Sequence, residues 1–503
     1  MKYLLTLDVG TTAVKAGLFD ENLNVTALAI KEYSLITPQA NFVEMDPDTY
    51  WVKAKESISE VLSTAKINIA DIVSLTCTTQ GETLIPVGND GKPLSNAIVW
   101  LDARAKSEAE CLTDHFDHLM IYQTTGLPEI NGYCPISKVL WLKNNLTDIY
   151  DRAEKILLLE DYLIFKLSGK FISNPTLMCS TGYFNIHQNT IWKEILAYCD
   201  IAESKFPSII DSGQVVGEIL PEIAEELGLS AKLKITSGAM DQVSSAVGSG
   251  NVAVGNITET TGTAQVVATT CELIKSSEWS PVTIYRHAVK NKYLKIVINQ
   301  TAGIAYKWFR NEFCVDLINS NKDAFNLMGE LAEKEPPLSK GLTFFPHMTG
   351  MQFPISDESI KGVFFGVGLD TNRGCFIRSI MEGVGYMLRE SIDDMGLCPD
   401  SIISLGGGAK SPLWCQIKAD ICGIKISVLE NVESTSMGAA MMGCVAMGIF
   451  ENYDTARQEV VLRKEFRPTI ENLTAYNAAY KEYKGMYSIF SPIFSSRLKK
   501  GDT

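Results

Sequence analysis

Two apolar runs separated by a turn rich in glycine and threonine open the chain. Residues 3–7 and 14–19 are apolar and rich in β-forming side chains, and the segment Asp8-Val9-Gly10-Thr11-Thr12 lies between them. Glycine and short polar residues between two such runs are typical of a tight turn. We therefore predict a strand–turn–strand hairpin with an aspartate at its mouth.

The rest of the first half alternates between strand and helix patterns. Asp46-Pro47-Asp48, followed by Trp51, Ala54, Ile58 and Leu62, has the start signal and the spacing of an amphipathic helix. The other predicted elements of this half are strands at 72–77, 83–87 and 97–100 and helices at 138–142 and 162–167.

The pattern of the N-terminus returns near Ile235. Residues 235–250 indicate a strand, a turn and a helix of small residues, and residues 256–270 indicate a second hairpin with Gly262 at its turn. We interpret the two similar hairpins as a duplication at the scale of a domain. The expected domains are residues 1–245 and 246–503. Further on, the pattern predicts a strand at 402–405 and helices at 413–422, 436–448 and 476–487.

Length and charge limit the class of protein. A single hydrophobic core stops growing at roughly 250–300 residues, so a chain of 503 residues is expected to form two large domains. The net charge of −14 argues against nucleic acid or an anionic membrane as a partner. In such an acidic protein, a phosphate site has to be built locally from backbone N–H groups and a metal ion.

Cysteine usage and the apolar runs point to a cytoplasmic protein. The twelve cysteines contain no C-x-x-C pair, which favours reduced thiols in a reducing compartment and argues against a zinc site. The N-terminal apolar run is too short for a signal peptide, and no run reaches the roughly 18–20 residues that a membrane span needs.

Both hairpin turns have the composition of a phosphate-binding loop. Glycine lets the backbone approach a phosphate group, and threonine adds donors, in Asp8-Val9-Gly10-Thr11-Thr12 and again in Gly262-Thr263. Asp8 beside the first turn is a candidate Mg²⁺ ligand. A plain hairpin with a polar tip is the alternative for each turn taken alone.

Three consecutive glycines form a third candidate site. Gly406-Gly407-Gly408 follows a predicted strand, and so many glycines are costly unless a ligand such as adenine or ribose must approach the backbone. A tight strand–helix turn is the alternative. The segment is not a dinucleotide fingerprint, because Ser411 stands where the last glycine of that motif would be.

Polar side chains at the ends of predicted strands form the candidate acceptor site. Asp241 and Gln242 follow one strand, and a carboxylate there can accept a hydroxyl proton during phosphoryl transfer. Local sequence by itself favours a helix N-cap role for Asp241. The segments 80–83 and 100–104 offer amides, carboxylates and a tryptophan face for a sugar, although Asp102 and Arg104 fit a structural ion pair equally well.

Taken in order, these segments resemble the FGGY family of carbohydrate kinases over nearly the whole chain. The segment 133–145, YCPISKVLWLKNN, fits the first signature of the family at every constrained position. Residues 362–382 resemble the second signature, with one departure at Cys375, where a polar residue is usual.

The resemblance implies an α/β fold with two RNase H-like domains, of the actin and sugar-kinase type, on either side of a catalytic cleft. It implies that Asp8 helps to place Mg²⁺ and that Asp241 is the catalytic base, in place of the helix cap. The residues that it assigns to ATP are Thr11, Thr12, Lys15, Gly262, Thr263, Gly303, Lys307, Gly407, Gly408 and Ser411.

On the acceptor side, the chain is similar to glycerol kinases, with one difference. The residues predicted to contact the acceptor are Gln80, Glu82, Trp100, Asp102, Tyr133, Asp241 and Gln242. Glycerol kinases carry an arginine where this chain has Gly81, so we expect a more open site and a longer acceptor than glycerol. A ketopentose such as xylulose or ribulose is expected, with erythritol, fuculose, gluconate and glycerol as alternatives.

Two other classes of function stay open at this stage. An actin-like ATPase that is not a kinase would explain the hairpins but not the segments 80–82 and 133–141. A sugar-sensing protein without activity would not need both Asp8 and Asp241. The expected partner is a small sugar or polyol, and a homodimer is left open.

Overall fold

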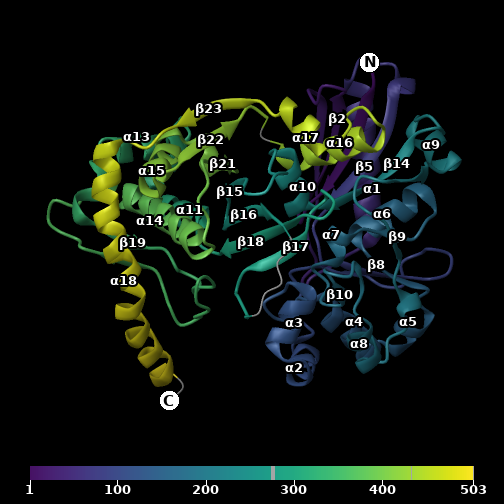
Figure 1. Cartoon of the computed structure of the whole chain (residues 1–503), viewed down its shortest axis with the longest axis horizontal. Coiled ribbons are helices and arrows are strands. Elements are labelled where there is room, and N and C mark those ends of the chain that lie inside the picture. The colour runs from purple at the N-terminus through teal and green to yellow at the C-terminus, as the bar shows by residue number, and fades with distance from the viewer. Residues whose placement is uncertain (273–277, 432, 502–503) are drawn as a thin grey trace. The chain divides into compact units, whose positions relative to one another are not determined.

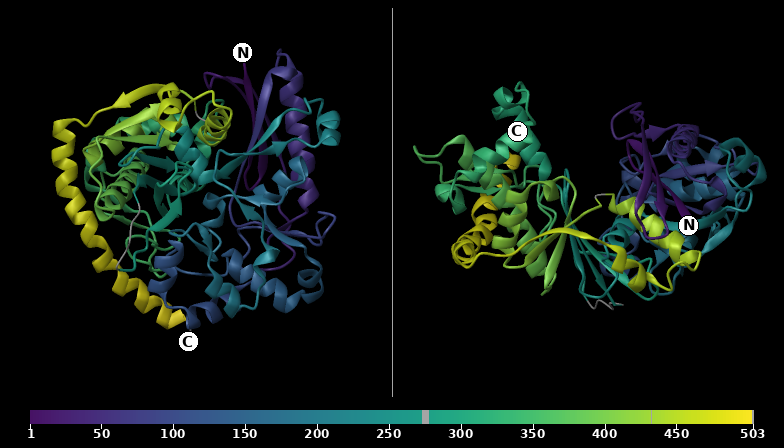
Figure 2. Two further views of the ribbon diagram at one scale, coloured as in Figure 1. Left: turned by 45° about the vertical axis from the view of Figure 1, so that its right-hand side comes forward. Right: turned by 90° about the horizontal axis from the view of Figure 1, so that it is seen from above.

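The computed structural model describes residues 1–272, 278–431 and 433–501. The chain divides into two compact units, and neither is continuous in sequence. Unit 1 comprises Met1–Val254, Thr270–Lys295 and Glu433–Val460, and unit 2 comprises Gly255–Thr269, Ile296–Val432 and Val461–Thr503. Figures 1 and 2 show the course of the chain through both units.

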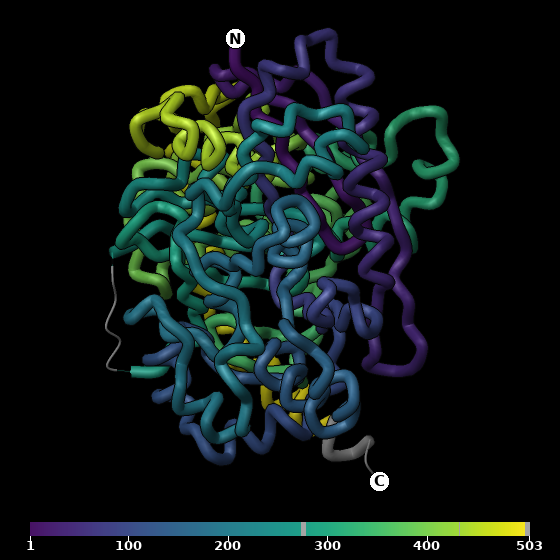
Figure 3. Tube along the Cα trace, turned by 90° about the vertical axis from the view of Figure 1, so that its right-hand side faces the viewer, coloured from purple at the N-terminus to yellow at the C-terminus, as the bar shows by residue number. Residues whose placement is uncertain are grey.

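The larger sheet of unit 1 has six strands in the order β13-β14-β5-β1-β2-β3. β1 pairs antiparallel with β2, and both β1 and β14 run parallel to β5. The strands of this sheet are β1 (Tyr3–Val9), β2 (Ala13–Asp20), β3 (Val25–Glu32), β5 (Ile72–Thr79), β13 (Val215–Glu218) and β14 (Lys234–Met240). The predicted N-terminal hairpin is β1 and β2, drawn in purple in Figure 3.

Helix α1 (Pro47–Thr64) covers this sheet as the apolar spacing predicted. Asp46 is its N-cap, and its carboxylate accepts a hydrogen bond from the backbone N–H of Asp48. Trp51, Ala54 and Ile58 are buried in the core of unit 1. Because these residues recur every three or four positions, they share the helix face that packs on β2 and β3.

The remaining elements of unit 1 include a four-stranded sheet in the order β4-β7-β6-β8. The other strands of this unit are β4 (Glu44–Met45), β6 (Leu84–Val87), β7 (Ala97–Ile98), β8 (Lys155–Leu158), β9 (Ile172–Ser173), β10 (Phe184–Asn185), β11 (Thr190–Ile191), β12 (Ser208–Ile209) and β17 (Thr283–Arg286). The other helices are α2 (Lys106–His115), α3 (His118–Thr125), α4 (Pro135–Asn145), α5 (Thr147–Arg152), α6 (Leu159–Ser168), α7 (Pro175–Met178), α8 (Lys193–Tyr198), α9 (Pro221–Leu227), α10 (Asp241–Gly248), α16 (Ser434–Ala446) and α17 (Tyr453–Ala456).

Unit 2 contains a sheet with β16, β15, β21, β22 and β23 in that order, and β18 lies on the other side of β16. Its strands are β15 (Ile257–Thr261), β19 (Thr343–Phe345), β20 (Val363–Phe365), β21 (Ser401–Leu405), β22 (Lys425–Leu429) and β23 (Leu462–Phe466), together with most of β16 (Gln265–Cys271) and of β18 (Tyr293–Asn299). Its helices are α11 (Gly303–Phe313), α12 (Val315–Ile318), α13 (Ala324–Glu333), α14 (Arg373–Asp394), α15 (Pro412–Cys422) and α18 (Ile470–Gly501). The second predicted hairpin is β15 and β16, which pair antiparallel.

The compact units differ from the continuous domains expected from sequence, because α16 packs in unit 1 although it lies late in the chain. α16 contacts α10 and β1. Ser244 Oγ donates to the carbonyl oxygen of Thr435 at 2.8 Å, and a Cβ at Gly438 would collide with the backbone of Ser244. Small residues on both helices therefore allow a close approach that the linear pattern does not reveal.

The α/β class predicted from the sequence is confirmed by these two sheets with their covering helices. Within the residues that the structure describes, no helix is both long enough and apolar enough to cross a membrane.

Candidate active site

The N-terminal hairpin carries the predicted phosphate turn of unit 1. The backbone N–H of Gly10 donates to the carbonyl oxygen of Ala13 at 3.0 Å, which closes the turn and leaves Thr11 and Thr12 at its tip. Lys15 stands opposite Asp8 in the hairpin register. Lys15 Nζ lies 3.9 Å from Asp8 Oδ2 and 2.9 Å from Glu433 Oε2.

Asp8 is a nearly buried carboxylate with little compensation. Only 7% of the residue is exposed. Burial raises the pKa of Asp8 to about 6, the positive charge of Lys15 opposes this rise, and the negative charge of Glu433 adds to it. Proteins hold Mg²⁺ through one or two carboxylates together with substrate phosphates. A buried anion that is only partly neutralised, next to a glycine and threonine turn, fits such an ion.

Asp241 lies at the carboxyl end of β14 and is the first residue of α10. The N-cap residue of α10 is Met240, so the helix-cap role that local sequence favoured for Asp241 is wrong. Asp241 Oδ1 accepts a hydrogen bond from the backbone N–H of Gln242 at 2.6 Å. Burial raises the pKa of Asp241 to about 7, the negative charges of Asp8 and Glu82 raise it further, and the bond from Gln242 opposes them.

Glu82 lies beside Asp241 in a strained backbone conformation. Its φ is +65°, which is uncommon for a residue with a side chain and is found most often at functional sites. Burial raises the pKa of Glu82 to about 7, and the positive charge of Lys138 opposes this rise. Gln80, two residues before Glu82, is buried and donates from Nε2 to Tyr50 Oη at 3.4 Å.

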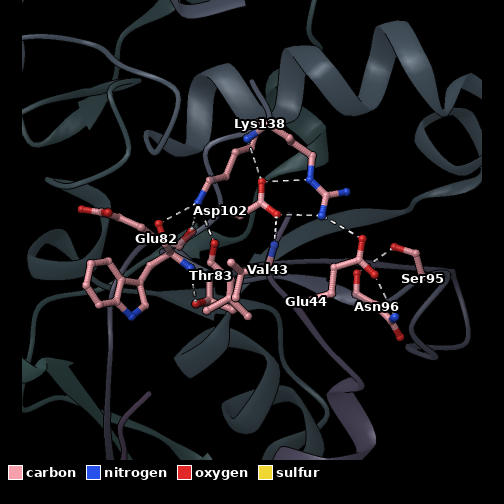
Figure 4. A network of polar contacts seen from close by, with 11 residues as sticks. Val43, Glu44, Glu82, Thr83, Ser95, Asn96, Asp102 and Lys138 are labelled. Atoms are coloured by element: carbon pink, nitrogen blue, oxygen red, sulfur yellow. Dashed lines mark hydrogen bonds and ion pairs between the residues drawn. The ribbon is translucent and has the colours of Figure 1, made fainter. Parts of the chain in front are cut away.

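Lys138 holds in place the two loops that carry Glu82 and Trp100. Its side chain is completely buried, and Nζ donates to the carbonyl oxygens of Val99 at 2.9 Å, Trp100 at 3.3 Å and Glu82 at 3.4 Å. Figure 4 shows Lys138 reaching Glu82. Lys138 belongs to the YCPISKVLWLKNN motif, which connects that motif to the loops that carry Glu82 and Trp100.

Trp100 connects the acceptor loops to the phosphate hairpin. Its Nε1 donates to Thr11 Oγ1 at 3.0 Å, and 36% of the residue is exposed. Its backbone N–H donates to Thr83 Oγ1 at 3.2 Å. The indole face is therefore fixed in direction and partly open to a ligand.

Asp102 forms the structural ion pair that the sequence allowed. It is completely buried, and its carboxylate accepts from Arg104 Nη2 at 2.7 Å, Arg104 Nε at 2.9 Å and the backbone N–H of Val43 at 2.5 Å. Arg104 also donates to Glu44 Oε1 at 2.8 Å. Figure 4 shows this network. Because its oxygens accept these hydrogen bonds, Asp102 positions the loop, and its predicted contact with the acceptor stays a prediction.

The space beside Gly81 is filled by other side chains, contrary to the expected opening. A Cβ at Gly81 would lie 2.8 Å from Met240 Sδ and 3.3 Å from Ser180 Oγ. Met240 and Ser180 are both buried. The sulfur of Met240 thus occupies space that a side chain at position 81 would need.

Two tyrosines of unit 1 bear on the predicted acceptor site. Tyr133 is 45% exposed, in keeping with a side chain that meets a ligand. Tyr285, on β17, was missed by sequence reasoning. Burial raises the pKa of its phenol well above the usual value, and the negative charges of Glu82 and Asp241 contribute. No motif marks Tyr285, because it comes from a strand far along the chain.

In unit 2, the predicted nucleotide residues line one cavity of about 890 Å³. This volume is within the range of ligand sites. The predicted residues in its wall are Gly262, Thr263, Gly303, Lys307, Gly407, Gly408 and Ser411. Ser411 is also the N-cap of α15, where its Oγ accepts from the backbone N–H of Trp414 at 3.3 Å.

The turn of the second hairpin is joined to the start of α11. The backbone N–H of Gly303 donates to the carbonyl oxygen of Gly262 at 2.9 Å, and that of Ile304 donates to Thr263 at 3.1 Å. A Cβ at Gly303 would collide with the carbonyl oxygen of Gly262. Glycine is therefore required at this contact.

An aromatic wall of the same cavity was not predicted. Tyr306 and Phe325 stack with their ring centroids 5.7 Å apart, and Trp414 lies 5.1 Å from Tyr306. All three line the cavity. Aromatic faces of this kind suit a flat adenine ring. The three residues come from α11, α13 and α15, so only the folded unit brings them together.

Comparison with known proteins identifies the family. The model of the FGGY family of carbohydrate kinases matches with its N-terminal domain over residues 3–248 and with its C-terminal domain over residues 257–447. The chain belongs to the FGGY family. FGGY kinases are sugar phosphotransferases, and this chain is accordingly an ATP-dependent carbohydrate kinase.

Similar FGGY proteins match over nearly their whole length. The xylulose kinase of Bacillus subtilis (strain 168) is 28% identical, with 97% of each chain covered. The crystal structure of ligand-bound xylulose kinase from Lactobacillus acidophilus has a TM-score of 0.90 at 26% identity and covers 99% of this chain and 100% of its own. Gluconate kinase from the same organism has a TM-score of 0.89 at 26% identity, with 98% of this chain and 99% of that chain covered.

Proposed function

We propose that this FGGY kinase transfers the γ-phosphoryl group of ATP to a terminal hydroxyl of a ketopentose, with xylulose as the first candidate. The relatives named xylulose kinase support this acceptor. The observation that carries the proposal is Asp241, a buried carboxylate at a strand end whose pKa is raised to about 7. A base with a pKa near the working pH is well suited to accept the proton of an alcohol.

In the proposed reaction, Asp241 accepts the hydroxyl proton and aligns the attacking oxygen. Its bond from the N–H of Gln242 fixes the direction of the carboxylate. The turns at Thr11 and Thr12 and at Gly262 and Thr263 supply backbone and hydroxyl donors to the phosphates. The cavity of unit 2 would hold the adenosine part of ATP.

Mg²⁺ is proposed as the metal cofactor, with Asp8 as its protein ligand. The ion would neutralise charge on the ATP phosphates during transfer. The contribution of this chain is the buried carboxylate of Asp8, which Lys15 neutralises only in part because its Nζ lies closer to Glu433. A homodimer stays a prediction.

The charges around the acceptor residues favour an uncharged sugar over gluconate. Glu82 and Asp241 both carry carboxylates there. Two buried cations of this region already have partners, since Lys138 donates to backbone carbonyls and Arg104 is paired with Asp102. Gluconate is the second candidate because of the similar gluconate kinase structure.

The Asp241→Asn variant tests the role of the base. We expect kcat to fall by a factor on the order of 10² to 10⁴, with little change in the KM of the acceptor. ADP release with xylulose, ribulose, fuculose, erythritol, glycerol and gluconate gives kcat/KM for each acceptor. Asp90→Asn, in an exposed turn, is the control. A near-normal kcat for Asp241→Asn would contradict its role as the base. A higher kcat/KM for gluconate than for both ketopentoses would overturn the proposed acceptor.

A further inference from the structure

Unit 1 contains a second cavity, of about 340 Å³, that none of the proposed acceptor or nucleotide residues lines. Most of its wall is formed by three segments: the loop before β13, the end of β17 with the residues that follow it, and the start of α17 with the residues before it. Pro175 and Val445 complete the wall. The volume is that of a small-ligand site. The cavity therefore has to be explained separately from the kinase reaction.

Two buried polar atoms in this wall have no hydrogen-bond partner among the described residues: Tyr453 Oη and Arg286 Nε. Tyr453 is only 9% exposed. Gly213 stands against this tyrosine, with a φ of +75°, and a Cβ there would collide with the hydroxyl. Buried polar groups in folded proteins almost always have partners, so two orphan donors in one cavity wall indicate that something binds there.

The guanidinium of Arg286 is held in a fixed direction. Its Nη1 donates to Tyr293 Oη at 2.7 Å, and its centre lies 4.9 Å from the ring of Tyr293. Nε is left without a partner by this arrangement. A fixed arginine edge is pre-organised for a ligand, because no rotamer freedom is lost on binding.

The charged groups of the wall are balanced in sign. Arg286 and Lys290 are cations, and Asp211 and Glu451 are anions. No ion pair joins any of these four side chains to another in the described part of the chain. The fifth titratable group, His287, is neutral, because burial lowers its pKa to about 4.

Donors and acceptors of both signs suit a molecule that can donate and accept at each of its polar groups. Hydroxyl groups do both. A simple anion would meet Asp211 and Glu451, and a simple cation would meet Arg286 and Lys290. We propose that this cavity binds a small uncharged polyhydroxylated molecule, a polyol or a sugar, at a site separate from the acceptor site.

The cavity is joined to the acceptor side by two strands. Arg286 directly follows Tyr285 on β17, and consecutive strand residues point to opposite faces. The backbone of Gly213 and Gln214 is hydrogen-bonded to Ser237 on β14, at 2.8 and 2.9 Å. Because β14 ends at Asp241, an occupant of the cavity contacts the supports of both Tyr285 and the proposed base.

The test measures binding of xylitol, a neutral polyol, to the full chain by calorimetry, in wild type and in Glu82→Gln, which weakens the acceptor site. We expect a binding component that survives Glu82→Gln. Adding Tyr453→Phe should weaken that component at least about tenfold, as for the loss of a hydrogen bond to a buried group. Inorganic phosphate, used as a second probe, should not bind to the cavity.

Tyr483→Phe is the matched control, since it removes another buried tyrosine hydroxyl without a partner, in unit 2 and away from this cavity. It should leave xylitol binding unchanged. Because the hydroxyl of Tyr453 has no partner in the protein, Tyr453→Phe should not lower the free energy of unfolding. The proposal is overturned if Glu82→Gln abolishes all xylitol binding, if Tyr453→Phe and Tyr483→Phe behave alike, or if phosphate binds instead. A kinase assay of Tyr453→Phe shows whether the proposed reaction takes place. Failure of the proposed cavity site is therefore distinguished from failure of the proposed reaction.

Discussion

Lys418 and Glu259 form an ion pair in which both side chains are completely buried, with Nζ 2.5 Å from Oε1. Lys418 Nζ also donates to Thr261 Oγ1 at 2.8 Å, and that hydroxyl donates to Glu259 Oε2 at 2.8 Å. Thr261 directly precedes the turn at Gly262. The pair thus connects α15 to β15, whose last residue, Thr261, lines the cavity of unit 2.

Replacing Lys418 with methionine should destabilise the protein strongly, because it leaves the carboxylate of Glu259 buried without a partner. We expect a loss of about 3–5 kcal/mol in the free energy of unfolding. Lys425→Met is the control, since Lys425 pairs with Glu465 at the same distance of 2.5 Å but at a partly exposed position. That variant should lose at most about 1 kcal/mol. Urea unfolding measures both values, and equal losses would contradict the role of the buried pair.

The activity should depend on pH through Asp241. Asp241 must be ionised to accept a proton, and its pKa is raised to about 7. The value of kcat/KM for the acceptor should therefore fall as the pH drops below about 7. Glu82→Gln removes a negative charge that raises this pKa, so the midpoint should move to lower pH. A pH profile of kcat/KM for both proteins checks the direction, with the exposed Asp90→Asn as the unshifted reference.

Gly303→Ala should weaken ATP binding selectively. The added methyl group would collide with the carbonyl oxygen of Gly262 and push α11 away from the phosphate turn. We expect the KM of ATP to rise on the order of tenfold or more, while the KM of the acceptor stays the same.

The control for Gly303→Ala is Gly485→Ala, in α18, where a Cβ meets nothing within 4 Å. That change should leave the kinetics unaltered and add about 0.5–1 kcal/mol of stability. Steady-state kinetics at varied ATP separate the two variants, and an unchanged KM of ATP in Gly303→Ala would rule out the contact as a determinant of binding.

Gly81→Ala should impair use of the acceptor, since its Cβ would lie 2.8 Å from Met240 Sδ and Met240 is adjacent to Asp241. A displaced base costs on the order of tenfold to a hundredfold in kcat/KM. Met240→Ala in the same chain removes the colliding sulfur and should restore part of the loss. Kinetics of the single and double variants at saturating ATP make the comparison. If the double variant had a lower kcat/KM than Gly81→Ala alone, a collision with Met240 would not be the cause of the loss.

The sequence predicted the parts of this protein whose cause is local. The hairpins at β1–β2 and β15–β16 follow from apolar runs around glycine and threonine turns. Helix α1 follows from the Asp46 cap and the spacing of Trp51, Ala54 and Ile58. The family and its α/β class followed from motifs that are continuous in the chain.

Local sequence was misleading where the same residue type can serve two roles and only the surrounding tertiary structure distinguishes them. Aspartate is a residue type favoured at helix N-caps, yet the N-cap of α10 is Met240 and Asp241 is the first helical residue. For Asp102 the sequence allowed an acceptor contact and an ion pair equally, and only the folded structure shows that Arg104 and the backbone N–H of Val43 donate to its oxygens. Gly81 indicated open space, but Met240 and Ser180 fill it.

The sequence by itself determined the two hairpins, the family and the residue types that a kinase site requires, because these depend on neighbours within a few positions. The tertiary structure alone decided the buried pair of Lys418 and Glu259 and the approach of Tyr285 to the acceptor carboxylates. It also placed the aromatic wall of the predicted nucleotide cavity and the hydroxyl of Tyr453, which has no hydrogen-bond partner among the described residues. Each of these joins segments that are distant in the chain, and a side chain becomes buried, paired or left unpaired only when such segments pack together.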